Sequence, residues 1–178
     1  MGDRRTVKSK KLILHAFEEL LQEHSFEEIS VTRLSEEAGI SRNTFYIYYL
    51  DKYSLLDEQF SWFTKLCRET IAAKLSVGSW NRFLETLDTS GTILKGLLRA
   101  EETQWVKERI RSIFTKELLA VYTHSFSENK LTLRGCGEAM AGIVEWWLSA
   151  THSEEEKATA MEALMLFQAL IDKEELFS

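Results

Sequence analysis

The chain has 178 residues, of which 22 are Lys or Arg and 28 are Asp or Glu, giving a formal net charge of −6 at pH 7. This acidic balance is not that of a protein that binds nucleic acid through overall positive charge. The length, the 44% content of hydrophobic residues and the absence of proline indicate one helical domain with a small appended head.

The first predicted helix runs roughly from Lys8 to Glu23, where apolar residues recur at helical spacing. Residues 1–11 hold five basic side chains against one acidic side chain, and the basic ones are Arg4, Arg5, Lys8, Lys10 and Lys11. Attraction to phosphate depends on local rather than net charge. This arm therefore either contributes to phosphate binding or is a solvated end, and the sequence favours neither.

Two short helices around a glycine turn are predicted between Val31 and Leu56. Ser30 is a plausible cap for the first helix, and Gly39 supplies the left-handed backbone conformation that ends it. Ser41 can cap the second helix by accepting a hydrogen bond from a backbone N–H of its first turn. This layout is typical of a helix-turn-helix, in which the second helix enters a DNA groove.

The polar residues of the second short helix suit DNA recognition. Arg42, Asn43 and Thr44 are its first exposed residues, and they can contact guanine, adenine and the thymine methyl group, respectively. The predicted contacts to phosphate are Thr32, Tyr46, Tyr48, Tyr49 and Lys52. The alternative is an ordinary helical hairpin, but three exposed tyrosines within four positions would then favour aggregation.

Residues Lys8 to Phe60 resemble the DNA-binding domain of the TetR family of bacterial transcriptional regulators. The family signature is an alanine–glycine turn followed by T-[FL]-Y-x-[HY]-[FV]-x-x-K-x-x-L-[LF]. This sequence carries it at Ala38, Gly39, Ile40, Ser41, Thr44, Phe45, Tyr46, Tyr48, Tyr49, Lys52, Leu55 and Leu56. The resemblance implies base contacts from positions 42–44 and backbone contacts from Thr32, Tyr46, Tyr48 and Lys52. Tyr48 replaces the usual histidine and Tyr49 the usual phenylalanine.

Beyond the turn, Asp51 is predicted to cap a helix that reaches about Leu75 and belongs to both head and body. The expected division is a helix-turn-helix domain over residues 1–52 and an effector-binding and dimerisation domain over residues 53–178. The body helices are expected at about Trp80–Asp88, Thr92–Arg99, Glu102–Ser127, Thr132–Ser149 and Ser153–Lys173, with a break at Val77-Gly78-Ser79. Ser153 and Glu156 form a predicted capping box.

The last two helices carry more apolar surface than one small body can hide, which favours a two-fold, four-helix dimer interface over a purely internal core. Its predicted residues are Ile143, Trp147, Ala160, Leu164, Phe167 and Ile171. Small residues at Gly135, Ala139 and Gly142 would let a neighbouring helix approach closely. A dimer also suits DNA, because two recognition helices read a palindrome with far greater specificity than one.

Aromatic residues of the body form either an effector pocket or a plain core. The candidate pocket residues are Trp62, Phe63, Phe83, Trp105, Phe114, Tyr122 and Trp146. Aromatic residues at helical spacing belong to the core more often than to a pocket, so for any single residue the core is favoured. The resemblance implies an effector site somewhere in the body.

The sequence gives little support to an enzyme, a metal site or a cofactor. Its four histidines, His15, His24, His124 and His152, show no metal-binding spacing, and Cys67 and Cys136 indicate no disulfide framework or zinc site. No stretch of 18 apolar residues or signal peptide is evident, so we expect a cytoplasmic protein that does not bind membranes.

The sequence thus predicts an all-α, homodimeric regulator that binds double-stranded DNA and responds to a small-molecule or protein effector. A repressor released from a palindromic operator is favoured. The alternatives are an activator or co-regulator whose body binds a partner protein, and a dimeric scaffold that no longer binds DNA.

Overall fold

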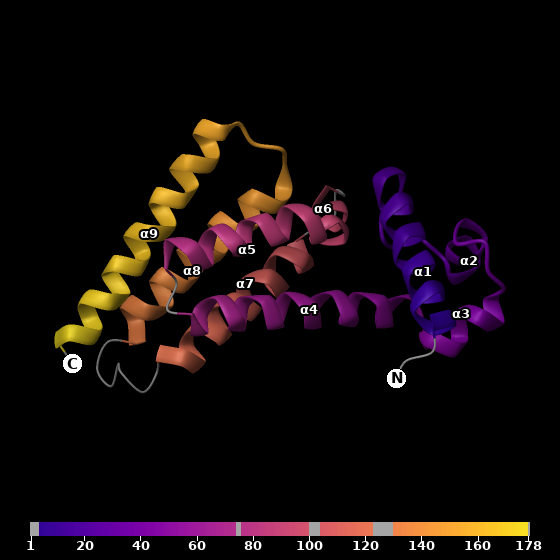
Figure 1. Ribbon diagram of the computed structural model, residues 1–178, viewed down its shortest axis with the longest axis horizontal. Helices are drawn as coiled ribbons and strands as arrows, with labels where there is room; N and C mark the ends of the chain where they lie inside the picture. The colour runs from indigo at the N-terminus through magenta and orange to yellow at the C-terminus, as the bar shows by residue number, and fades with distance from the viewer. Residues whose placement is uncertain (1–3, 74–75, 100–103, 123–129, 178) are drawn as a thin grey trace. The chain divides into compact units, whose positions relative to one another are not determined.

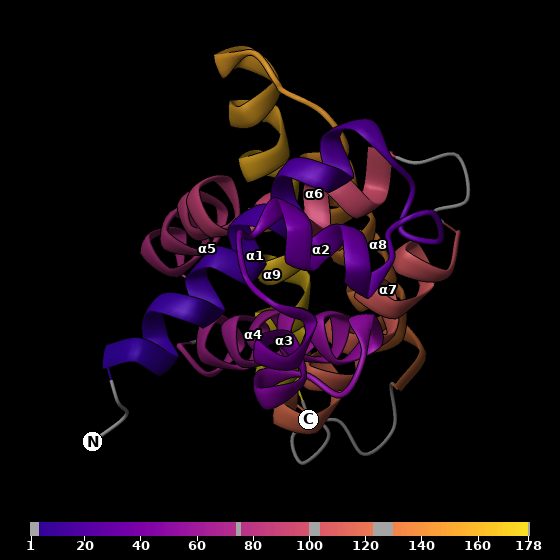
Figure 2. The same cartoon turned by 90° about the vertical axis from the view of Figure 1, so that its right-hand side faces the viewer.

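The computed structural model describes residues 4–73, 76–99, 104–122 and 130–177, and these parts of the chain form nine α-helices without a strand. The predicted all-α class is confirmed. Figures 1 and 2 show the helices, which are α1 (Arg4–Glu23), α2 (Val31–Glu37), α3 (Arg42–Tyr48), α4 (Lys52–Ala72), α5 (Val77–Ser90), α6 (Thr92–Arg99), α7 (Gln104–Tyr122), α8 (Lys130–Ser149) and α9 (Glu154–Phe177). None of the described helices is long and apolar enough to cross a membrane.

The helices group into two compact units. Unit 1 contains residues 1–61 together with 92–103, and unit 2 contains residues 62–91 together with 104–178. Helix α4 is continuous through the change from unit 1 to unit 2 at residues 61 and 62. The grouping differs from the expected division at residue 52, because the start of α4 and the whole of α6 join the N-terminal helices.

Side-chain caps set the starts of the helices in unit 1, as the sequence predicts. The Ser30 and Ser41 hydroxyls accept hydrogen bonds from the backbone N–H groups of Arg33 and Thr44. At the start of α4, the Asp51 carboxylate accepts one from the Ser54 N–H at 2.8 Å. Each cap satisfies a backbone donor that a helix start leaves without an intrahelical partner. Between α2 and α3, Gly39 has a φ of 63°, which favours glycine.

Apolar residues at helical spacing close the core of unit 1. Ile13, Phe17, Leu34 and Phe45 are all completely buried. Helix α6 joins this unit through a close approach to α1, because a Cβ added at Gly96 would lie 2.9 Å from Leu21 Cβ. A larger residue at position 96 would therefore push the two helices apart.

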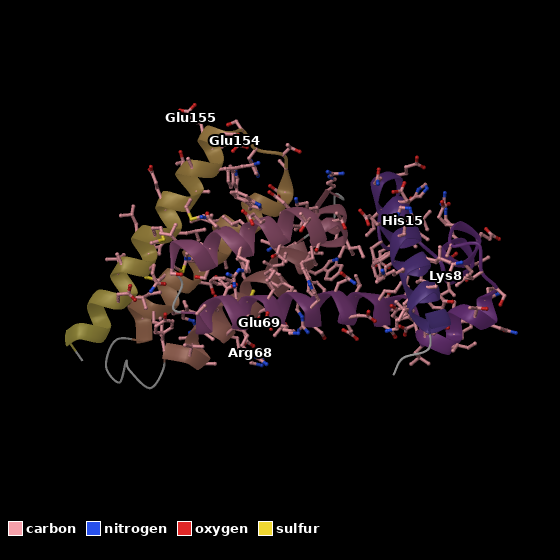
Figure 3. All side chains as sticks on the ribbon, viewed as in Figure 1. Lys8, His15, Arg68, Glu69, Glu154 and Glu155 are labelled. Atoms are coloured by element: carbon pink, nitrogen blue, oxygen red, sulfur yellow. The ribbon has the colours of Figure 1, made fainter. Side chains whose placement is uncertain are left out.

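Unit 2 is built on an aromatic core and on ion pairs between its helices. Trp80, Phe83 and Phe114 are fully buried and in ring contact, and the Trp80 and Phe114 rings stack at 6.0 Å between centroids. From α4, Arg68 donates to both carboxylate oxygens of Glu117 on α7, at 2.8 and 3.1 Å. Figure 3 shows Arg68 beside Glu69 on α4. The bidentate pair fixes α4 against α7 in geometry as well as in charge.

Two helix limits in the body differ from the predicted ones. The stretch Val77-Gly78-Ser79 does not break the chain but forms the first turn of α5, because the Ser76 hydroxyl accepts a hydrogen bond from the Ser79 N–H. Helix α9 extends to Phe177, beyond the predicted Lys173. The predicted ends of the third body helix, Glu102 and Ser127, lie outside the described residues, as does Leu75.

Helix α9 begins with the predicted capping box. The Glu156 carboxylate accepts hydrogen bonds from the N–H and hydroxyl of Ser153, and the Ser153 hydroxyl accepts one from the Glu156 N–H. Figure 3 shows Glu154 and Glu155 in the same first turn, where negative charge interacts favourably with the positive end of the helix dipole. The hydrogen bonds from Ser153 lower the pKa of the Glu156 carboxyl.

This lowered pKa predicts a pH-dependent stability contribution. Because the folded pKa lies below the unfolded one, the stabilisation is present above the unfolded pKa and is lost as pH falls through the folded pKa. We expect the melting temperature of the Glu156→Gln variant to approach that of the parent as the solution is acidified below about pH 4. Thermal unfolding followed by circular dichroism over a pH series measures this. A difference that stays constant with pH would contradict the charge-dependent cap.

Candidate nucleic-acid interface

The start of α3 presents the three residues predicted to read bases. Arg42 and Asn43 are exposed, and Thr44 is partly buried. The Thr44 and Ser41 hydroxyls lie 2.9 Å apart in a hydrogen bond, so the Thr44 hydroxyl belongs to the helix cap. A hydroxyl held in this way leaves the methyl group of Thr44 as the part suited to a thymine contact.

Three of the residues predicted to contact phosphate keep some exposure. Thr32 is exposed in the first turn of α2, and Tyr48 is partly buried at the end of α3. Tyr46 is 48% exposed, and its ring meets the buried Phe45 ring edge-on at 5.7 Å. This contact fixes the Tyr46 ring from one side and leaves the other side free for a partner.

Tyr49 lies in the core instead of at the surface. Its side chain is only 4% exposed, and among the described atoms its hydroxyl has no hydrogen-bond partner. Burial, together with the nearby Glu58 carboxylate, raises the pKa of the Tyr49 hydroxyl well above its ordinary value. Lys10 forms a salt bridge with Glu58 at 2.9 Å and lies over the Tyr49 ring. This position does not suit the predicted phosphate contact of Tyr49.

The ammonium group of Lys52 makes its contacts within unit 1. The group donates hydrogen bonds to the carbonyl oxygens of Phe26 and Glu27, at 2.8 and 3.0 Å, and lies 4.4 Å from the centre of the Phe26 ring. These contacts tie the start of α4 to the segment between α1 and α2. Two hydrogen bonds of the Lys52 ammonium are thus directed at the protein backbone, and its predicted contact with phosphate stays a prediction.

Two apolar residues near the predicted contacts were missed by the sequence reasoning. Ile47 is 73% exposed and Leu50 is 82% exposed. The signal was present, because Phe45 and Tyr49 are four residues apart and face inward, which turns Ile47 to the opposite side of α3. An exposed isoleucine beside the base-reading residues can contact thymine methyl groups.

The basic arm is only partly described. Lys8, which Figure 3 labels, and Lys11 are exposed, whereas Lys10 is engaged with Glu58. The side chains of Arg4 and Arg5 lie outside the described residues.

The comparison with known protein families matches this region. Residues 13–58 match the family model described as bacterial regulatory proteins, tetR family. The matched stretch covers α2 and α3 together with parts of α1 and α4. No curated protein matches the chain.

Solved structures share the fold of the whole chain. A TetR transcriptional regulator from Streptococcus agalactiae 2603V has a TM-score of 0.65 at 20% identity, over 95% of this chain and 96% of that one. The TetR family repressor AlkX from Dietzia sp. strain DQ12-45-1b, implicated in biodegradation of n-alkanes, has a TM-score of 0.56 at 17% identity, over 91% and 94%. A γ-butyrolactone receptor described as ArpA-like has a TM-score of 0.54 at 14% identity, over 97% and 100%. The body therefore has the TetR fold too.

In the TetR-fold body, the aromatic residues predicted to line one effector pocket fall into three groups. Phe63, Phe114 and Tyr122 are buried in the core. Trp62 and Phe83 line a hollow between α4 and α5. Trp105 and Trp146 are 40% and 37% exposed, respectively. Trp146 stacks on His152 with ring centres 3.6 Å apart.

The residues predicted for the dimer interface fall into two groups, one buried within the chain and one partly exposed. Trp147, Ala160, Leu164 and Ile171 are buried within their own chain, and the Trp147 indole donates to the Asp88 carboxylate at 3.1 Å. Ile143 and Phe167 are partly exposed. Leu166 and Leu170 of α9, which the predicted set of interface residues does not include, are 68% and 48% exposed.

A groove lies along the outward side of α8 and α9. It has a volume of about 490 Å³ and is lined largely by small or apolar residues, among them Ala139, Gly142, Ile143, Ala160 and Ala163. At Gly135 and Gly142, no described atom lies within 4 Å of the position that a Cβ would take. By contrast, Gly137 packs closely against Leu118 and Thr115 of α7. The two sides of α8 therefore differ in their packing.

Proposed function

We propose that the protein is a homodimeric, DNA-binding transcriptional repressor that leaves a palindromic operator when an effector binds its body. The observation that carries the proposal is the capped start of α3, where Arg42, Asn43 and Thr44 stand together beside exposed Tyr46. A guanidinium, an amide and a methyl group are the side-chain groups that distinguish base pairs in the major groove.

Residues around this start supply contacts to the DNA backbone. Thr32 offers a hydroxyl in the first turn of α2, near backbone N–H groups that a helix start leaves free. Tyr46 and Tyr48 offer phenol groups, and exposed Lys8 and Lys11 offer charge. Such contacts fix the register of a protein on DNA without reading its sequence. In this proposal Tyr49 helps to hold the domain together and does not contact phosphate.

A second copy of the chain is the proposed occupant of the outward face of α8 and α9. Buried positions 160, 164, 168 and 171 of α9 repeat at helical spacing on its inward side, and all of them except Gln168 are apolar. Leu166 and Leu170 are four residues apart on its outward side, next to the groove at Gly142 and Ala163. Open space at the α8 glycines supports the close approach of another helix.

The Gly142→Arg variant tests this interface. We expect it to be monomeric at concentrations where the parent is a dimer, because a long charged side chain would enter the closely packed centre of a helix-helix contact. Its fold should persist, since no described atom lies within 4 Å of the added Cβ. Sedimentation equilibrium measures the mass, and Gly142→Ala serves as a matched control that should stay dimeric. An unchanged dimer in the arginine variant would rule out this face.

Release from DNA is proposed to act through α4, which is one helix with its start in unit 1 and its end in unit 2. An effector that favours one conformation of the body would change the separation of the two α3 helices in the dimer. A tenfold loss of operator affinity needs about 1.4 kcal/mol of differential binding.

Selection of bound duplexes from a random pool, with purified protein near physiological salt, tests the function. A palindromic consensus with half-sites about one helical turn apart would support a dimeric reader. No enrichment would favour the scaffold alternative. If the consensus appears but an added partner protein increases occupancy or transcription, the activator reading replaces the repressor.

A further inference from the structure

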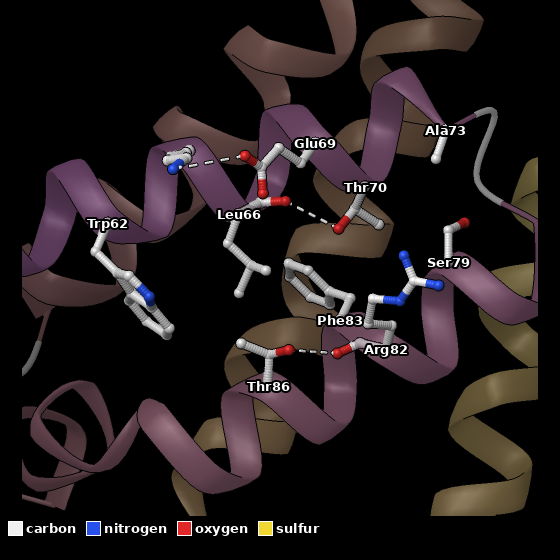
Figure 4. A pocket seen from close by; sticks show the side chains of 10 residues that line it. Trp62, Leu66, Glu69, Thr70, Ala73, Ser79, Arg82, Phe83 and Thr86 are labelled. Atoms are coloured by element: carbon white, nitrogen blue, oxygen red, sulfur yellow. Dashed lines mark hydrogen bonds and ion pairs between the residues drawn. The ribbon is translucent and has the colours of Figure 1, made fainter.

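A hollow of about 290 Å³ lies between α4 and α5 in unit 2. Figure 4 shows it from close by, with the Trp62 indole at one end and Ser79 near the other. Its lining includes Trp62, Leu66, Thr70, Ser79, Arg82 and Phe83. The volume is close to the lower end of the range for small-molecule sites, about 300–1,000 Å³. It therefore suits a ligand with one ring or a short chain.

The Arg82 guanidinium is the most informative group in this hollow. Within the part of the chain that the structure describes, it makes no ion pair or hydrogen bond. Two other arginines of unit 2 form ion pairs: Arg68 pairs with Glu117 at 2.8 Å and Arg111 with Glu145 at 2.7 Å. Arg82 is an exposed residue, so its guanidinium is open to a ligand as well as to water.

Charges at the rim of the hollow leave Arg82 uncompensated. Lys65 and Glu69 both line the hollow and form an ion pair with each other at 3.7 Å, which Figure 4 draws as a dashed line. Their charges cancel, so the lining carries about one net positive charge from Arg82. A monoanion would balance that charge, whereas a dianion would exceed it.

The hydroxyl groups of the lining donate their protons in hydrogen bonds to backbone carbonyls, so these protons are not free for a ligand. Thr70 donates to the Leu66 carbonyl at 2.9 Å, Thr86 to the Arg82 carbonyl at 2.6 Å, and Ser79 to the Ser76 carbonyl at 2.8 Å. The planar fork of Arg82 remains as a free donor, and its geometry matches a carboxylate in a bidentate arrangement. Opposite it, Trp62, Leu66 and buried Phe83 supply apolar walls.

We propose that this hollow binds a small amphipathic carboxylate, with the carboxylate at Arg82 and the apolar part beside Trp62 and Phe83. The bound ligand bridges α4 and α5 and is the effector that alters DNA binding. Its role as effector rests on the proposed function, but its binding does not.

Calorimetric titration of the purified full chain tests binding, with benzoate and hexanoate as probes and benzamide and hexanamide as their neutral counterparts. At least one of the two acids is expected to bind with a Kd at or below about 1 mM, and its amide at least about tenfold more weakly. Arg82→Gln should weaken binding of that acid at least about tenfold, since it removes the charge and the fork. Arg134→Gln, which changes an exposed arginine of α8 outside the hollow, is the matched control and should bind as the parent does. Equal melting temperatures of the two variants would show that both are folded.

Binding of neither acid, equal binding of acid and amide, or unchanged binding by Arg82→Gln would each overturn the site. The effector role has its own readout, which is release of the selected duplex by the acid that binds. Binding through Arg82 without release overturns the effector role and leaves the site. Failure to select any duplex counts against the proposed function, while the calorimetric result still decides the site.

Discussion

Replacing Arg42 by alanine is expected to lower affinity for the selected operator by roughly 30-fold to more than 10⁴-fold, and to remove the preference for guanine at one position of each half-site. Each bidentate arginine–guanine contact discriminates by about 1–3 kcal/mol, and a two-fold dimer has two copies of Arg42. Arg42 is exposed in the first turn of α3 and its side chain supports no helix cap, so the fold should not change.

Tyr46→Phe is the matched control for this prediction. It keeps the ring that packs against Phe45 and removes only the hydroxyl, so it should weaken all sequences alike. Titration of labelled operator and of single-base variants by fluorescence anisotropy, at several salt concentrations, separates the two effects. If Arg42→Ala left the base preference unchanged, the assignment of base reading to the start of α3 would be wrong.

Phe114→Ala is expected to reduce the free energy of unfolding by about 3–5 kcal/mol, a large part of the roughly 5–15 kcal/mol of a typical domain. The Phe114 side chain is completely buried and contacts the rings of Trp80 and Phe83, with centroids 6.0 and 6.4 Å away. Removing the ring loses its burial and leaves a cavity that rigid neighbours cannot fill.

Urea unfolding followed by tryptophan fluorescence and circular dichroism measures this loss. Leu131→Ala is the control, because Leu131 is 82% exposed and its replacement should change stability by no more than about 0.5 kcal/mol. The experiment also separates the two predicted roles of the aromatic residues. A loss below about 1 kcal/mol would mean that Phe114 lines open space, as a pocket residue would.

The features that the sequence predicted well are those decided within a few residues. Ser30, Ser41, Asp51 and Ser153 each cap a helix through an atom only three residues away, so local pattern is sufficient. Gly39 is similar, because the need for a positive φ arises from the turn itself. The start of α5 was placed too late because Ser76, the residue that caps it, was not considered against the glycine at position 78.

The features that the sequence predicted less well depend on distant partners. The phosphate contact of Lys52 stays a prediction, but the sequence did not indicate that its ammonium donates to carbonyls of Phe26 and Glu27, about 25 residues earlier in the chain. No local pattern indicates such contacts. The aromatic residues offered more information than was used, since Trp105 and Phe114 are nine residues apart on α7 and therefore face opposite sides. One is 40% exposed and the other is completely buried.

The contact between Gly96 of α6 and Leu21 of α1 bears on how domains of this kind can be exchanged. Residues 92–103 are grouped with the N-terminal helices although thirty residues of unit 2 precede them in the chain, over positions 62–91. A fragment cut after Ser61 would leave the surface of α1 around Leu21 without its natural cover. A chimera that transplants the N-terminal domain between relatives therefore has to include the α6 that belongs to that domain. Otherwise the residue at position 96 has to be chosen so that it fits against the residue at position 21 of the new domain.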